Sequence, residues 1–103
     1  MKALLCSAAV VFASTSVCLA AVDCASLMRM HGMLSRAQSQ CHYAKYSQQL
    51  VAMARQCSHK MSSGDVQNSL RSGMTTFDLS EKRFGHKKTC NNVLRDYPKL
   101  VVN

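Results

Sequence analysis

The side chains best suited to chemistry in this 103-residue sequence are the methionines and the histidine of one short segment. Met28, Met30, His31 and Met33 fall within six residues. Thioether and imidazole groups are ligands that suit copper ions, so the segment supports the hypothesis of a copper- or metal-handling protein. The competing interpretation is core filling. On one helix Met30 and Met33 share a side, and Met28 and His31 do not lie with both.

The first 20 residues are typical of a secretory signal peptide, as described below, and four cysteines follow them. They are Cys24, Cys41, Cys57 and Cys90. An even number in a short exported chain indicates a disulfide framework. A zinc site is the alternative, but no pair has the close Cys-x-x-Cys spacing that zinc sites favour. We therefore expect two disulfides and, because a bridged sulfur is not a nucleophile, no cysteine catalysis.

The carboxylates also argue against catalysis. The five Asp and Glu residues are widely spaced and stand in contexts typical of helix starts. We therefore predict that the chain is not an enzyme, and we predict no bound cofactor.

The most suggestive surface feature is a basic segment near the end of the chain. Its Lys and Arg residues are Lys82, Arg83, Lys87 and Lys88. On a continuous helix Arg83 and Lys87 would be neighbours, as would Lys82 and His86. Phe84 would face the core or contact a partner. We predict that this basic helical surface binds a partner, and the alternative is a solvated helix face.

The net charge of residues 21–103 has two interpretations, attraction of an anionic partner or solubility alone. Residues 21–103 hold 12 Lys and Arg against 5 Asp and Glu, a net charge of +7. Such a surface attracts anions. We expect an anionic envelope component or an acidic protein as partner, and no nucleic acid, while the sequence leaves the oligomeric state open.

Helices must position these residues, because apolar side chains recur with helical spacing. The first set is Leu27, Met30, Leu34, Ala37 and Cys41, and the second is Tyr43, Tyr46, Leu50, Met53 and Cys57. Both sets predict an amphipathic helix, with a turn near residues 42–44. β-branched residues are scarce after residue 20, which disfavours strands.

A third helical region follows the boundary at residues 62–65. Its expected buried face is Val66, Leu70, Met74 and Phe77, followed by Phe84, Cys90, Leu94 and Tyr97. The Asp78-x-x-Glu81 spacing resembles a capping box, so a helix could restart there. Residues 65–97 are thus one bent helix or two. The fold class predicted is all-α, a small three- to four-helix bundle with two disulfides.

Helix geometry selects the disulfide pairing. Cys24 and Cys41 would lie about 25 Å apart along the first helix, and Cys41 and Cys57 about 24 Å apart along the second. A disulfide needs Cα atoms within about 7 Å. The remaining pairing is Cys24–Cys57 with Cys41–Cys90. It requires the second helix to return antiparallel to the first.

The first 20 residues are typical of a secretory signal peptide. Lys2 precedes an uncharged run of apolar and small residues that ends at Ala20. We predict cleavage after Ala20, or less favourably after Ala21, which leaves residues 21–103 as one disulfide-stapled helical domain with no transmembrane segment. Because the run is short and interrupted by serines, a membrane span is the weaker interpretation.

This layout of signal, few helices and paired cysteines resembles small exported proteobacterial proteins. Some of these are periplasmic acid-stress chaperones, and others are Tai-type immunity proteins that neutralise exported peptidoglycan amidases. The resemblance lies in architecture, so it assigns no role to any residue. It implies a periplasmic or secreted protein that binds, inhibits or protects. The alternative stays a periplasmic metal-handling protein.

Overall fold

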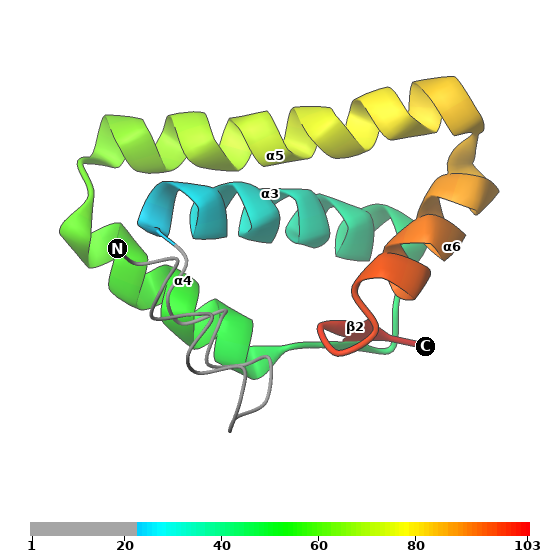
Figure 1. Cartoon of the computed structure of the whole chain (residues 1–103), viewed down its shortest axis with the longest axis horizontal. Coiled ribbons are helices and arrows are strands. Elements are labelled where there is room, and N and C mark those ends of the chain that lie inside the picture. Colours follow the sequence, from blue (N-terminus) through cyan, green and yellow to red (C-terminus); the bar gives the residue numbers. More distant parts are fainter. Residues whose placement is uncertain (1–22) are drawn as a thin grey trace, which may run out of the picture.

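Four helices and one pair of short strands make up the part of the chain that the structure, a computed structural model, describes: residues 23–103. The helices are α3 (Cys24–Cys41), α4 (Gln48–Lys60), α5 (Ser63–Phe84) and α6 (His86–Asp96), and the strands are β1 (Lys45–Tyr46) and β2 (Val101–Val102). Figure 1 shows α5 lying along α3, with α4 near one end of α3 and α6 near the other. The predicted all-α class with two disulfides is confirmed. The predicted signal peptide, residues 1–20, lies outside the described residues.

Polar side chains determine where three of the helices begin. Asp23, Ser47 and Ser62 precede α3, α4 and α5, and each accepts a hydrogen bond from the backbone N–H three residues later, at 2.9–3.1 Å. Such caps each stabilise a helix by about 1 kcal/mol. The fourth helix, α6, begins after Gly85, which offers no side-chain cap.

The closest approach in the fold is between α3 and α5. A Cβ atom on Gly73 would lie 2.0 Å from the carbonyl oxygen of Arg29, and one on Gly32 would lie 2.3 Å from that of Leu70. The two backbones therefore touch at positions where only glycine fits. This contact places α5 directly on the central helix.

Close packing explains why the buried face of α5 differs from the predicted one. The buried residues are Ser69, Gly73 and Phe77, whereas Met74 is 38% exposed. The small residues turn toward α3 because they let the backbones meet. The prediction is confirmed for Phe77, and Val66 and Leu70 pack partly buried against the core, but it is wrong for Met74. Apolar periodicity selects large side chains and therefore misses Ser69 and Gly73.

The prediction that Tyr43 and Tyr46 belong to the second helix is wrong. α3 ends at Cys41 and is capped by His42 in the left-handed conformation (φ 57°), and α4 begins only at Gln48. Between them, β1 pairs antiparallel with β2, Tyr46 opposite Val101. The apolar C-terminal tail is thus docked, with Val101 1% exposed.

Both predicted disulfides are confirmed. Cys24–Cys57 and Cys41–Cys90 close with Cα–Cα distances of 5.3 and 5.7 Å. α4 returns toward the start of α3, and α5 then runs in the same direction as α3 (Figure 1). The chain breaks into two helices at Gly85 (φ 90°), a conformation that glycine adopts readily. That break turns α6 toward Cys41. Because α5 continues through Asp78, no helix restarts there.

Two disulfides indicate that the protein resides in an oxidising compartment. Within residues 23–103, none of the helices combines the length and the apolar character needed to cross a membrane.

Candidate functional site

The basic segment forms a corner of the molecule. We call residues 82–88 the basic corner, because α5 ends and α6 begins within it. All seven of its residues are exposed. The break at Gly85 puts Lys82 and Arg83 on α5, and Lys87 and Lys88 on α6. The predicted neighbours on one continuous helix are therefore wrong, and the cations project from two helices instead.

The four cations of the basic corner lack acidic partners. The ion pairs within residues 23–103 are Arg36–Asp78, His86–Glu81 and Arg95–Asp96. Glu81, the acid nearest to the corner in sequence, is thus engaged by His86. The first turn of α6 contains no acid. Lys87 and Lys88 stand there against the positive end of the helix dipole, an arrangement that an external anion would relieve.

Phe84 lies among these cations. It is 47% exposed, so the prediction that it is buried with Cys90 and Leu94 is wrong. The guanidinium carbon of Arg83 lies 5.8 Å from its ring centroid, and Nζ of Lys88 lies 5.6 Å from it. Cation–π contacts of this kind contribute about 0.5–1 kcal/mol at exposed sites. They hold an aromatic surface and two charges in one place.

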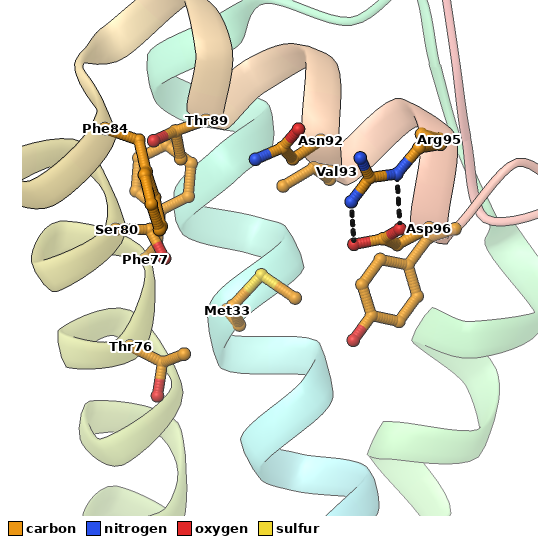
Figure 2. A pocket seen from close by; sticks show the side chains of 11 residues that line it. Met33, Thr76, Phe77, Ser80, Phe84, Thr89, Asn92, Val93, Arg95 and Asp96 are labelled. Carbon is orange, nitrogen blue, oxygen red and sulfur yellow. Dashed lines mark hydrogen bonds and ion pairs between the residues drawn. The ribbon is translucent and has the colours of Figure 1, made fainter.

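Phe84 also borders a pocket of about 360 Å³ between α3, α5 and α6 (Figure 2). Its walls are Met33, Thr76, Phe77, Ser80, Phe84, Thr89, Asn92, Val93, Arg95, Asp96 and Tyr97. Thr89 is 2% exposed, and its hydroxyl has no hydrogen-bond partner among the described residues. Nothing in the sequence pattern pointed to this pocket, because residues of three helices compose it.

Arg95 and Asp96 stand side by side at one part of the pocket wall (Figure 2). Nε of Arg95 donates to Oδ1 of Asp96 at 2.9 Å. This hydrogen bond raises the pKa of Arg95 and lowers the pKa of Asp96. Because the two charges satisfy each other, the unpaired charge near the pocket is that of the basic corner.

The structure does not bring the four residues of the Met/His cluster into one site. Met28 is 3% exposed in the core, whereas Met33 lines the pocket. Met30 packs partly buried against the core. At 3.6 residues per turn, Met28 and His31 lie on roughly the opposite side of α3 from Met30 and Met33.

His31 has a structural partner instead. Its Nδ1 lies 2.8 Å from the hydroxyl of Tyr46. Burial lowers the pKa of His31 and raises the pKa of Tyr46. Both shifts favour the neutral forms, which suit a hydrogen bond that ties β1 to α3.

Among residues 23–103, no group of three or more His, Cys, Asp and Glu side chains is arranged to hold a metal ion. Comparison of the chain with protein-family models found no match, and comparisons with curated proteins and with solved structures found none either. The chemistry of the basic corner and the pocket is therefore the basis for a functional proposal.

Proposed function

We propose that this protein is an exported binding module, periplasmic or secreted, that recognises an acidic segment of a partner protein through its basic corner. One observation carries the proposal: four exposed cations without acidic partners, two of them in contact with a half-exposed phenylalanine, gather at the rim of a pocket. In this role the protein would inhibit or shield its partner rather than transform it.

The pocket favours a protein partner over an anionic lipid surface. A flat membrane would contact only the protruding side chains and would leave the pocket empty. At about 360 Å³ the pocket lies at the small end of ligand sites, a size that suits one or two inserted side chains. Arginine and aromatic residues around such a cavity are typical of binding hot spots. Phe84 would contact the apolar anchor, and Arg83 and Lys88 beside it would pair with the acidic flanks of the partner segment.

The test uses a fluorescein-labelled peptide rich in Asp and Glu with one central Leu, and measures binding by anisotropy. We expect the affinity to fall with salt concentration, because the Debye length shortens from about 10 Å at 0.1 M salt to about 3 Å at 1 M. The variant with Lys82, Arg83, Lys87 and Lys88 replaced by Gln should bind at least about tenfold more weakly. Four exposed ion pairs at a few tenths of a kcal/mol each amount to roughly 1.4 kcal/mol.

A matched control separates the basic corner from overall charge. Replacing the exposed Arg55, Lys60, Arg71 and Lys99 by Gln removes the same four charges from elsewhere, and should leave most of the affinity intact. Equal losses in the two variants would reduce the effect to net charge and refute the proposal. Binding to phosphatidylglycerol vesicles, with none to the peptide, would refute it too by assigning the corner to a lipid surface.

A further inference from the structure

A second chemical arrangement lies where the basic corner meets the Cys41–Cys90 disulfide. Nδ1 of His86 contacts Oε2 of Glu81. The other ring nitrogen, Nε2, lies 3.7 Å from Sγ of Cys90. A carboxylate, an imidazole and a disulfide sulfur thus lie in a row, each in contact with the next. When the imidazole carries both protons, Nδ1–H donates to Glu81 and Nε2–H faces the sulfur.

The other disulfide has no such arrangement. None of the remaining histidines of the chain contacts the sulfur atom of Cys24 or Cys57 within the described residues. Cys57 is only 8% exposed. Cys24 does begin α3, a position that stabilises thiolates. There, however, the carboxylate of Asp23 already accepts the N–H of Ser26 and supplies a negative charge.

From this contrast we infer that Cys41–Cys90 is a thiol–disulfide exchange site, with His86 as proton donor to Cys90. The substrate class is a dithiol. This inference does not depend on the proposed partner binding.

The reaction balances as a two-electron exchange. A thiolate of the dithiol attacks Sγ of Cys41, the Cys41–Cys90 bond breaks, and its electron pair leaves on Sγ of Cys90. Nε2 of His86 gives that sulfur a proton, which solvent then replaces. The second thiol of the dithiol attacks the mixed disulfide and releases Cys41. The dithiol is oxidised to a disulfide, and its two protons are balanced by the two thiols formed.

Cys90 is the better leaving group because its surroundings favour the thiolate. Lys87 stands three residues earlier on α6, which puts it on the same face as Cys90. Cationic neighbours lower the pKa of a thiol, and a thiol of lower pKa leaves faster.

Reduction need not release α6 from the fold. The hydroxyl of Tyr43 donates to the backbone carbonyl of Cys90 at 2.7 Å. Thr89 and Val93 are buried, at 2% and 6% exposure. These contacts keep Cys90 beside Cys41 after the bond opens, so the bridge can form again. The site is therefore suited to reversible exchange.

The experiment treats the oxidised protein with limiting dithiothreitol, stops the reaction with N-ethylmaleimide, and maps the labelled cysteines by mass spectrometry. We expect Cys41 and Cys90 to be labelled before Cys24 and Cys57. His86→Ala should slow opening of Cys41–Cys90 at least about threefold, because the departing sulfur loses its proton donor and the leaving group controls the rate of exchange. The rate at Cys24–Cys57 should not change, and it serves as an internal test of folding.

His59→Ala is the matched control, because His59 is exposed and lies two residues from Cys57. It should alter neither rate. The proposal is overturned if both bridges open at the same rate. It is also overturned if Cys41–Cys90 opens first but His86→Ala leaves its rate unchanged, since exposure alone would then explain the order.

Discussion

The two ends of the molecule are built from the same parts, a helix start and a disulfide, yet they differ in charge and burial. At one end, Asp23 caps α3 beside Cys24–Cys57, and Cys57 is buried. At the other end, α6 begins without a side-chain cap or an acid in its first turn, and Cys41–Cys90 lies beside exposed cations. We call them the capped end and the corner end.

The difference shows which groups the fold uses for itself. At the capped end, charge and hydrogen-bond donors are satisfied within the chain. At the corner end, four cations and the first N–H groups of α6 are left for other molecules. A chain stabilised by its own contacts has no need for such an arrangement, so the corner end is where we place both binding and exchange.

The largest expected effect is the loss of a disulfide. Replacing Cys24 and Cys57 together by Ser opens a closed loop of 33 residues, and replacing Cys41 and Cys90 opens one of 49. The chain-entropy account gives about 4 kcal/mol for each. Against a typical total stability of about 5–15 kcal/mol, either loss is severe.

Urea unfolding of the two double variants, followed by helical circular dichroism, measures these losses. We expect nearly equal falls in the free energy of unfolding, because loop length enters only as a logarithm. A much smaller loss at the corner end would show that the packing of α6 already holds Cys90 in place. A much smaller loss at the capped end would instead contradict our view of that end as the structural one.

The next effect lies at the α3–α5 contact, which joins the two ends. Gly73→Ala forces a methyl group against the backbone of Arg29 and should cost about 1–3 kcal/mol, as overpacking does. Gly64→Ala, in the same helix with open space around it, should raise stability by up to about 1 kcal/mol. Thermal melts of the two variants should therefore shift in opposite directions. Equal shifts would disprove the close approach.

Prediction from sequence succeeded where covalent and helical geometry left few choices. Cys24 and Cys41 lie at the two ends of one helix, so they cannot pair, and this exclusion led to the correct disulfides. It failed where the pattern had two meanings. Tyr43 and Tyr46 continue a helical spacing by coincidence. The strand partners of Lys45 and Tyr46 are Val102 and Val101, which lie more than 50 residues away and beyond any local signal.

The candidate site was predictable only in part. The cluster of cations is visible in the sequence, and its exposure follows from its charge. The pocket is not visible, because it depends on the close α3–α5 contact and on the angle at Gly85. That angle also places His86 against Glu81 of α5, whereas the approach of His86 to Cys90 follows from their spacing of four residues on α6.

The smallest expected effect is on the pH dependence of stability. It is tested by comparing a partly buried histidine, His31, with an exposed one, His59. Burial lowers the pKa of His31 below its ordinary value of 6.5, so the unfolded chain binds a proton more readily than the folded one. Stability should therefore be complete above pH 6.5 and should fall as the pH drops below it. Because His31 is only partly buried, we expect this loss to be the smallest of those predicted here. His31→Gln keeps a group that can bond to Tyr46 but removes the titration, so the urea midpoint of this variant should depend less on pH than that of the parent.

His59→Gln, at an exposed position, should leave the pH dependence of the parent intact. Matching pH profiles for the parent and His31→Gln would show that the hydrogen bond between α3 and β1 does not depend on a neutral imidazole.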